Sequence, residues 1–338
     1  MPCQSLPHPM TSPAVTSAGH SIGSILTKLS RSKLLRKGVA RPFLFINERV
    51  WNCLPQSIKG LQLVRRYGSF LHKLVQMRAS RQQYHGTFFL RNRPELALLR
   101  SLADRLPAAA PLQITVVACS NGAEVYSIAW TIRSARPDLR LVIHAVDISS
   151  EILDTARAGV YSLEVDRRIN APIFARLTEP EIDSMFARDG DKLRIRPWLR
   201  ENIHWHAADA TDPALASRIG PADIVIANRF LCHMDPSDAE RCLRRLELLV
   251  KPRGYLFVSG VDLEIRARVA LDLGWSVVPD LLEEIHNGDP SLHQDWPWQY
   301  WGLEPFTTSR PDWRIRYASV FCVGQHALNC EEAGGLRN

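Results

Sequence analysis

The sequence predicts an α/β protein in which a doubly wound, mostly parallel sheet follows a small, basic, helical N-terminal domain. Three observations predict this fold. Strand-like and helix-like segments alternate from about residue 84 onward, a turn of small residues joins a β-branched strand to a helix, and basic charge gathers in the first third of the chain. The 338 residues suffice for about two domains, and a hydrophobic fraction of 46% provides for a sizeable core.

The second part of the chain, 84–325, is expected to form the sheet. Short apolar runs rich in β-branched residues favour strands, and longer runs with helical spacing favour helices. We expect strands at 114–118, 141–146, 203–206, 222–227 and 255–259, with a further one at 314–323, and helices at 94–106, 123–135, 149–158 and 236–250. An insertion at 161–202, with a helical piece at 178–188 and an extended piece at 192–196, could cover a substrate.

The first part of the chain differs in composition. Residues 1–20 are rich in Pro, Ser and Thr, which is typical of disorder, whereas 21–83 is expected to be helical. Within it, 22–37 alternates apolar and basic residues as an amphipathic basic helix does, and such a helix can contact a membrane surface. Residues 46–82 place apolar side chains near helical spacing, and 326–338 are expected to form a flexible tail.

Charge is divided unevenly along the chain. Residues 1–100 hold 16 Lys and Arg but only the acids Glu48 and Glu95, a net charge of +14, while the whole chain carries +7. An acidic protein helix, nucleic acid or anionic lipid would complement this segment. A solvated basic helical face would account for the same charge, so an acidic partner is one of two interpretations.

Composition excludes other classes of protein. No apolar run approaches the ~20 residues that a membrane-spanning helix needs, and no signal-peptide pattern opens the sequence. We therefore expect a cytoplasmic protein without an integral membrane segment.

The seven cysteines are odd in number and form no C-x-x-C pair, which favours reduced thiols. The histidines lack convincing metal-ligand spacing, so no metal is expected.

The stretch 114–129 carries the strongest chemical signal. It reads as a strand, a turn of small residues and a helix opened by Glu124. Small residues let a nucleotide-like ligand lie against the backbone, and the N–H groups at the start of the helix are available to it. A second strand ends at Asp147, where a carboxylate suits the two hydroxyls of a ribose. The sequence therefore predicts a nucleotide-type site.

Three motifs follow one another in a specific order and spacing. They are Thr87-Phe88-Phe89-Leu90-Arg91, Tyr126-Ser127-Ile128-Ala129 after the small-residue turn, and Asp147-Ile148 followed by Leu153, Ala156, Arg157, Ala158, Gly159, Val160 and Tyr161. Together they resemble the CheR family of S-adenosylmethionine-dependent methyltransferases, which esterify glutamates of chemotaxis receptors. The resemblance covers roughly 84–262. It implies a Rossmann-like class I methyltransferase fold with S-adenosyl-L-methionine as cofactor.

The resemblance also implies roles for individual residues. Thr87 and Arg91 occupy the positions of the family's T-x-F-F-R motif, where Arg91 can pair with the cofactor carboxylate or hold an acceptor carboxylate. Glu124 matches the second acid of the family's G-E-E turn, and Asp147 matches the ribose-binding acid. Asp209 stands where the family has Asn-Leu and can accept from the adenine amine. The expected cofactor-binding residues are Thr87, Arg91, Ala118, Ser120, Gly122, Glu124, Asp147, Ile148, Asp209, Ala210, Asn228 and Arg229.

The chain departs from the family pattern mainly on the acceptor side. The substitutions are His85 for Asn, Ala123 for the first acid of the G-E-E turn, Asn228-Arg229 for Arg-Asn, His233 for Tyr, and Arg253 for the first Gly of Pro-Gly-Gly. These changes leave the cofactor cradle intact. They put a receptor glutamate as the acceptor in question.

Beyond residue 262 the sequence no longer looks like the chemotaxis enzymes. The Trp-rich segment 296–301 would either wall an acceptor pocket or pack as a satellite core.

The kind of acceptor decides whether a general base is needed. An anionic carboxylate acceptor needs none, whereas a hydroxyl or amine needs one; His233 is then the first candidate and Asp262 the second. With Arg91, these are the candidate catalytic residues. A hydrogen-bonded structural role is the alternative for His233.

The leading functional hypothesis is methyl transfer from S-adenosylmethionine to an oxygen, in a carboxylate or hydroxyl of a protein or small-molecule acceptor. Methylation of chemoreceptor glutamates is one alternative. Another, of a different class, is a catalytically inactive cofactor-binding module that acts on an acidic partner through the basic segment. A nucleic-acid acceptor is disfavoured, because the chain lacks the Asn/Asp-Pro-Pro-aromatic motif of enzymes that methylate base amines.

Overall fold

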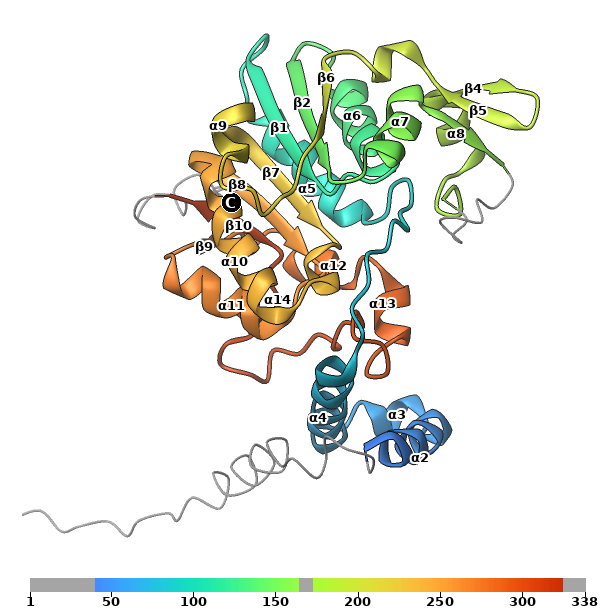
Figure 1. The fold of residues 1–338 in the computed structure, drawn as a ribbon, viewed down its shortest axis with the longest axis vertical. Helices are drawn as coiled ribbons and strands as arrows, with labels where there is room; N and C mark the ends of the chain where they lie inside the picture. Colours follow the sequence, from blue (N-terminus) through green and yellow to red (C-terminus); the bar gives the residue numbers. More distant parts are fainter. Residues whose placement is uncertain (1–39, 164–172, 325–338) are drawn as a thin grey trace, which may run out of the picture. The chain divides into compact units, whose positions relative to one another are not determined.

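The computed structural model describes residues 40–163 and 173–324 (Figure 1). The expected disordered segment 1–20, amphipathic helix 22–37 and tail 326–338 lie outside these residues. Within the described ranges, no helix combines the length and the apolar character that crossing a membrane requires.

The described chain divides into two compact units, the first ending at Arg78 and the second beginning at Ala79, five residues before the expected start at 84. The first unit is helical, as expected. Its helices are α2 (Ala40–Cys53), α3 (Gln56–Lys59) and α4 (Gln62–Arg78). Burial is uneven around them, because Trp51 is 5% exposed while Leu63 is 77% exposed.

A seven-stranded sheet forms the centre of the second unit. Its order is β6-β2-β1-β7-β8-β10-β9, and β10 runs antiparallel to both its neighbours while the pairs from β6 to β8 are parallel. The strands are β1 (Pro111–Val117), β2 (Arg140–Asp147), β6 (Ile203–Ala207), β7 (Ala222–Asn228), β8 (Val250–Ser259), β9 (Ser276–Val277) and β10 (Val320–Val323). The predicted fold class is confirmed, and the five strands expected before residue 260 are present.

Helices cover both faces of this sheet and bury a separate core on each (Figure 1). One face carries α5 (Arg93–Asp104), α6 (Ala123–Ala135) and α7 (Ser150–Ala158), and the other carries α9 (Leu215–Ile219), α10 (Pro236–Leu246) and α11 (Leu263–Asp272). Successive side chains of a strand point to opposite faces of the sheet, so Val116 belongs to the first core and its neighbour Val117 to the second. Burial on both faces accounts for the apolar runs in the central strands.

The insertion forms a small antiparallel sheet. Its strands, in spatial order, are β3 (Val160–Ser162), β5 (Lys192–Ile195) and β4 (Phe186–Asp189), and α8 (Glu179–Met185) precedes β4. The helix expected at 178–188 is therefore wrong beyond Met185. Phe186 pairs with Ile195 and packs its ring edge-on against Phe89, so tertiary packing turns this stretch into a strand.

The strand expected at 314–323 is wrong in its first half. Helix α14 (Trp313–Tyr317) occupies that half, and β10 begins only at Val320. The Arg316 side chain is 6% exposed and its Nε donates to Glu304 Oε1 at 2.8 Å. A buried ion pair thus fixes this turn of helix, and the apolar pattern gives no sign of it.

Strand β8 begins earlier than expected and contains a bulge. The helix expected at 236–250 ends at Leu246, and Val250 already pairs with Ala222 before the register shifts. Arg253 lies in the bulge with a φ of 65°. A left-handed conformation costs a residue with a Cβ roughly 1–2 kcal/mol, which explains why glycine suits the position that Arg253 occupies here.

Candidate active site

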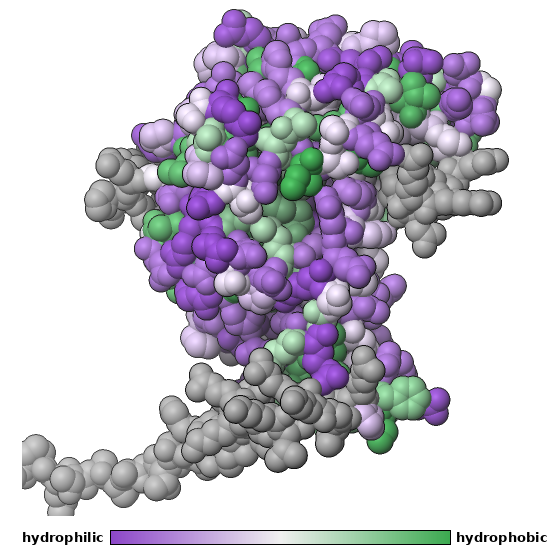
Figure 2. Space-filling view, viewed as in Figure 1, coloured by the Kyte–Doolittle hydropathy of each residue, from purple (hydrophilic) through white to green (hydrophobic). Residues whose placement is uncertain are grey.

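A cavity of about 600 Å³ opens where β1, β2 and β7 end. This is the carboxyl edge of the parallel strands, at which open α/β sheets bind ligands. Most of the visible surface of the second unit is hydrophilic, and apolar residues gather around a hollow near its middle (Figure 2). The cavity has the size of sites that hold small molecules and cofactors.

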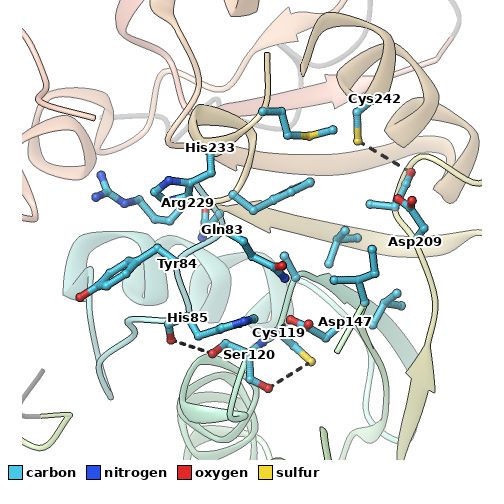
Figure 3. Close-up of a pocket in the computed structure, with 18 of the residues that line it drawn as sticks. Gln83, Tyr84, His85, Cys119, Ser120, Asp147, Asp209, Arg229, His233 and Cys242 are labelled. Carbon is cyan, nitrogen blue, oxygen red and sulfur yellow. Dashed lines mark hydrogen bonds between the residues drawn. The ribbon is translucent and has the colours of Figure 1, made fainter. Parts of the chain in front are cut away.

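The small-residue loop after β1 forms one wall of the cavity. Ala118 and Ser120 line it with positive φ angles of 56° and 51°, and the Ser120 hydroxyl donates to the His85 carbonyl at 2.8 Å (Figure 3). Gly122, with a φ of 86°, does not line the cavity. A Cβ there would lie 3.0 Å from the Cβ of Ala156, so this glycine allows the turn to pack on α7. Its expected contact with the cofactor stays a prediction.

Asp147, the last residue of β2, is held by the backbone. It is 5% exposed; its Oδ2 accepts from the Ser120 N–H at 2.8 Å and its Oδ1 from the Ser149 N–H at 3.0 Å. Each carboxylate oxygen keeps a second acceptor site, so the group can still receive two ligand hydroxyls. Ile148 lines the cavity beside it and is 58% exposed.

Asp209 and Ala210 follow β6 and line the cavity, and Asp209 lies on the opposite side of the close-up from His233 (Figure 3). The Asp209 Oδ1 accepts from the Thr211 N–H at 2.7 Å, which leaves Oδ2 for a ligand. Cys242 of α10 lines the same side, with its Sγ 3.7 Å from the Ala210 carbonyl oxygen. This side of the cavity therefore offers one acceptor held by the backbone, Asp209, while Asp238, Arg241 and Arg245 of α10 also line the cavity.

Two buried carboxyl groups share one amide at the floor of the site. Asn228 Nδ2 donates to Glu95 at 2.7 Å and to Glu124 at 2.9 Å, and its Oδ1 accepts from Ser259 at 2.8 Å. Burial, with the charge of Glu124 second, raises the pKa of Glu95 to about 8, and burial raises the pKa of Glu124 too. At neutral pH the pair therefore keeps a proton.

Sequence reasoning missed Glu95. The only signal was the helix start at Asn92, whose Oδ1 accepts from the Glu95 N–H at 3.2 Å. A first-turn glutamate is ordinarily exposed, and only the folded chain shows that Glu95 is buried beside Glu124.

Arg91 and Thr87 line the cavity near Glu124. Thr87 is 7% exposed, and Arg91 Nη2 donates to the Gly86 carbonyl at 2.8 Å. Burial, followed by the neighbouring charge of Arg229, lowers the pKa of Arg91 to about 10. The guanidinium therefore stays charged at neutral pH and can hold a carboxylate in two-point geometry.

Arg229 and His233 lie side by side at the other end of the close-up (Figure 3). Arg229 has a φ of 63°, and a Cβ on Gly260 would come within 2.5 Å of its Cα, so a glycine is needed there. His233 Nδ1 lies 2.8 Å from the hydroxyl oxygen of Tyr300. Burial, then the charge of Arg229, lowers the pKa of His233 to about 4, which keeps the imidazole neutral at neutral pH.

The family model described as CheR methyltransferase, SAM binding domain, matches residues 85–263, more than half of the chain. The chain belongs to the CheR methyltransferase family. Chemotaxis protein methyltransferase 2 of Pseudomonas aeruginosa is 33% identical over 182 residues, which cover 51% of this chain and 61% of that protein. The protein named probable biofilm formation methyltransferase WspC, of Pseudomonas putida, is 29% identical over 191 residues, 55% of this chain and 43% of that protein. The chain thus spans about half the length of these CheR-type relatives.

A solved structure of magnesium protoporphyrin IX methyltransferase from Synechocystis PCC 6803, with bound SAM, is 15% identical over 55% of this chain and 71% of that one, with a TM-score of 0.31. A similarity this low says nothing about function. The cofactor of the CheR domain is S-adenosylmethionine, and the cavity at the carboxyl edge of its sheet is the place where the fold can receive it.

The structure gathers most of the expected CheR cofactor residues in one cavity. Those that line it are Thr87, Arg91, Ala118, Ser120, Glu124, Asp147, Ile148, Asp209, Ala210, Asn228 and Arg229. His233, the first candidate base, lines it as well. Their contacts with the cofactor and the acceptor stay predictions.

Asp262, the second candidate base, lies outside the lining of this cavity. Its Oδ2 accepts from Arg81 Nη2 at 3.0 Å, and the Arg81 side chain is 5% exposed. An anion paired with a buried guanidinium and set back from the cavity is poorly placed to remove a proton from an acceptor. The expected role of Asp262 as a base is therefore not supported.

Two further expectations about the acceptor side need correction. None of the described residues of 161–202 lines the cavity, so this part of the insertion does not cover the site. The tryptophans of 296–301 do not line it either, and Trp296 is 5% exposed, as in the packing alternative. Their neighbour Tyr300 does reach the site indirectly, through His233.

A segment that sequence reasoning passed over completes the wall. Gln83, Tyr84 and His85 line the cavity from the coil that leads into the CheR domain, and in the close-up Gln83 extends across its middle (Figure 3). A Cβ on Gly86 would lie 2.1 Å from the ring of Tyr84, so a larger residue there would displace this exposed ring. The His85 substitution had marked this segment as unusual without showing that it reaches the ligand edge.

Proposed function

We propose that this chain is an S-adenosylmethionine-dependent methyltransferase that transfers the methyl group to an oxygen, and that the oxygen belongs to a carboxylate of a protein. One observation carries the proposal. A single cavity has a backbone-held carboxylate, Asp147, on its nucleoside side and a guanidinium, Arg229, beside the neutral imidazole of His233 on the other.

The cofactor fits the first side of the cavity by chemistry. The Asp147 carboxylate would receive the ribose hydroxyls, and Asp209 would accept from the adenine amine. Glu124 and Arg91 carry opposite charges close enough for each to shift the pKa of the other, and both face the cavity. They would hold the ammonium and the carboxylate of the methionine part.

The other side of the cavity fits an anionic acceptor. A carboxylate attacks the sulfonium methyl carbon directly, the carbon–sulfur bond breaks with its electron pair going to sulfur, and a neutral ester forms. No proton is transferred, so no base is needed. The residues present have to align the acceptor oxygen with the methyl group and exclude water. Arg229 would bind and orient the acceptor carboxylate, and the buried setting of His233 limits the access of water.

The first unit supports a protein acceptor. Residues 40–78 hold seven Lys and Arg against one acid, Glu48, and Arg49, Arg66 and Lys73 are exposed. This surface complements an acidic protein better than a neutral metabolite. The names of the relatives also speak for a protein acceptor, since one is called a chemotaxis protein methyltransferase.

Transfer of a labelled methyl group tests the proposal. The full chain would be incubated with methyl-tritiated S-adenosylmethionine and either a purified acidic helical receptor fragment, lysate protein or the lysate's small-molecule fraction. Label on protein that alkali releases as volatile methanol is the expected result, because carboxyl esters hydrolyse where ethers and methylamines do not. Alkali-stable label would overturn the carboxylate assignment.

The same experiment separates the alternatives. Label on the receptor fragment would assign the chemoreceptor reaction, and label confined to small molecules would contradict a protein acceptor. Calorimetry with S-adenosylmethionine and S-adenosylhomocysteine accompanies it. Tight binding without transfer to any fraction would favour an inactive cofactor-binding module.

A further inference from the structure

We propose that Tyr300, in the C-terminal segment beyond the CheR match, fixes His233 in the tautomer that carries its proton on Nε2. His233 then presents a hydrogen-bond donor to the cavity and positions the acceptor oxygen. It does not act as a base. The acceptor part of this inference rests on the proposed function, whereas the tautomer itself does not.

The geometry joins the two side chains closely. His233 ends the 3₁₀ turn Leu231–His233, and its Nδ1 lies 2.8 Å from the Tyr300 hydroxyl oxygen. The two rings meet edge to face, with centroids 5.8 Å apart and planes at 89°. Tyr300 does not line the cavity and His233 does, so the contact is made through Nδ1, on the side of the ring away from the ligand space. No contact within the described chain engages Nε2, which leaves that nitrogen for a ligand.

The direction of the hydrogen bond follows from the chemistry of its two groups. A phenol hydroxyl is a stronger acid than the N–H of a neutral imidazole, and the unprotonated ring nitrogen is a stronger base than a phenol oxygen. Across the 2.8 Å contact, the Tyr300 hydroxyl therefore donates and His233 Nδ1 accepts. A neutral imidazole that accepts at Nδ1 carries its proton at Nε2. Burial and the charges of Arg229, Arg81 and Arg91 keep the ring neutral.

Arg81 holds the turn that carries His233. Its Nη1 donates to the carbonyls of Cys232 and Met234, both at 3.1 Å, and its Nη2 binds Asp262. The same guanidinium lies 5.7 Å from the centroid of the Tyr300 ring. The residues on either side of His233 are therefore held in place. This suits the proposed role of His233, because its Nε2–H must meet one acceptor oxygen in a fixed position. Arg81 and Tyr300 both lie outside the matched range 85–263, so flanking segments build this part of the site.

This tautomer is consistent with a carboxylate acceptor. One carboxylate oxygen attacks the methyl carbon while the other accepts from Nε2–H. A hydroxyl acceptor would find a donor where it needs a base, because the lone pair of the ring is taken up by Tyr300.

Nitrogen NMR of protein labelled with ¹⁵N-histidine reads the tautomer directly. The His233 signal is assigned by its loss in His233→Gln. We expect a protonated, pyrrole-type Nε2 and an unprotonated Nδ1 in the wild type, and a mixture of the two tautomers in Tyr300→Phe. Tyr317→Phe, which removes another hydroxyl hydrogen bond of the C-terminal segment, should leave the His233 signal unchanged. A wild-type proton on Nδ1, or an unaltered tautomer in Tyr300→Phe, would overturn the proposal.

Kinetics test the role of the donor independently. Glutamine can donate at this position but cannot act as a base, so His233→Gln should keep kcat within about tenfold while His233→Phe raises the acceptor KM by roughly tenfold, the scale of one lost hydrogen bond. The pH profile between 6 and 8 should stay flat in both. Equal loss in the two variants would contradict the donor role. The NMR result needs no acceptor, so absence of methyl transfer would sink the proposed function and leave the tautomer standing.

Discussion

The two ends of the cavity are built by different means. The end proposed for the nucleoside consists of loops that follow β1, β2 and β6, and its carboxylate, Asp147, is held by two backbone N–H groups. The end proposed for the acceptor consists of side chains, Arg229 and His233, and from outside the CheR match Arg81 holds the turn of His233 while Tyr300 contacts its ring. The proposed cofactor end thus depends on backbone geometry, whereas the proposed acceptor end depends on side chains that single substitutions can change.

The largest effect should come from Asp147→Ala at the nucleoside end. The variant loses the acceptor for two ribose hydroxyls, and hydrogen bonds to a charged group contribute about 1.5–3 kcal/mol each, so we expect S-adenosylmethionine affinity to fall on the order of 100-fold or more. Titration calorimetry measures it. Unchanged affinity would remove Asp147 from the ribose site and with it the division between the two ends.

The Asp147→Ala variant needs a stability control, because Asp147 also holds part of the loop structure. Asp147→Ala also leaves the N–H groups of Ser120 and Ser149 without their carboxylate partner, which costs about 1–3 kcal/mol of stability. Urea unfolding should therefore accompany the calorimetry. Asp154→Ala, on the exposed side of α7, is the matched control and should change neither quantity.

Arg229→Gln should damage the acceptor end alone. Removal of one charge-assisted contact with an acceptor carboxylate is expected to lower kcat/KM roughly tenfold to a hundredfold, while cofactor affinity stays within about twofold. Steady-state kinetics with a fixed acceptor, alongside calorimetry, provides both numbers. If cofactor affinity fell in parallel, the guanidinium would belong to the cofactor site, and the two ends would not be separable.

Much of the fold was readable from the sequence. The central strands are buried on both faces, so each appears as an apolar run, as at 141–146, and the parallel order follows from their alternation with helices. The misses have a common cause. Residues 186–189 and 313–317 take their structure from tertiary contacts, Phe186 on an aromatic cluster and Arg316 on Glu304. Local pattern carries no information on such contacts.

The residues of the site also divide into those that the local sequence predicts and those that distant contacts place. Asp147 could be predicted because a strand end determines where its side chain lies, and the structure places it in the cavity lining. Tyr300 could not, since 67 residues separate it from the histidine that it contacts, and no local spacing encodes that approach. Asp262 lies outside the cavity lining for a related reason. Its position just after a strand suggested the ligand edge, but Arg81, 181 residues earlier, holds its carboxylate.

Glu95→Gln tests the hydrogen-bond network that Glu95, Asn228 and Glu124 form at the floor of the cavity. The folded pKa of Glu95, about 8, exceeds the ordinary value of 4.5, so the folded state binds more protons between these values and stability falls as pH rises through that window. The slope is at most about 1.4 kcal/mol per pH unit for one proton. Glutamine removes the titrating group, so the unfolding free energy, measured in urea between pH 6 and 8, should vary less with pH than in the wild type. The exposed variant Glu48→Gln should keep the wild-type slope, and an identical slope in Glu95→Gln would show that Glu95 is not the titrating group.

The smallest effect is expected from Asp209→Asn. Asp209 is exposed, its Oδ1 is engaged by the Thr211 N–H, and an adenine amine needs only a neutral acceptor. Asparagine supplies that acceptor, so cofactor affinity should stay within about twofold, whereas Asp209→Ala should lose about two- to tenfold, the scale of one hydrogen bond. Titration calorimetry of the Asn and Ala variants with S-adenosylmethionine decides whether the hydrogen-bond acceptor or the negative charge of Asp209 matters for cofactor affinity. Equal losses in Asn and Ala would mean that the negative charge of Asp209 itself is used and that a neutral acceptor does not suffice for the adenine amine.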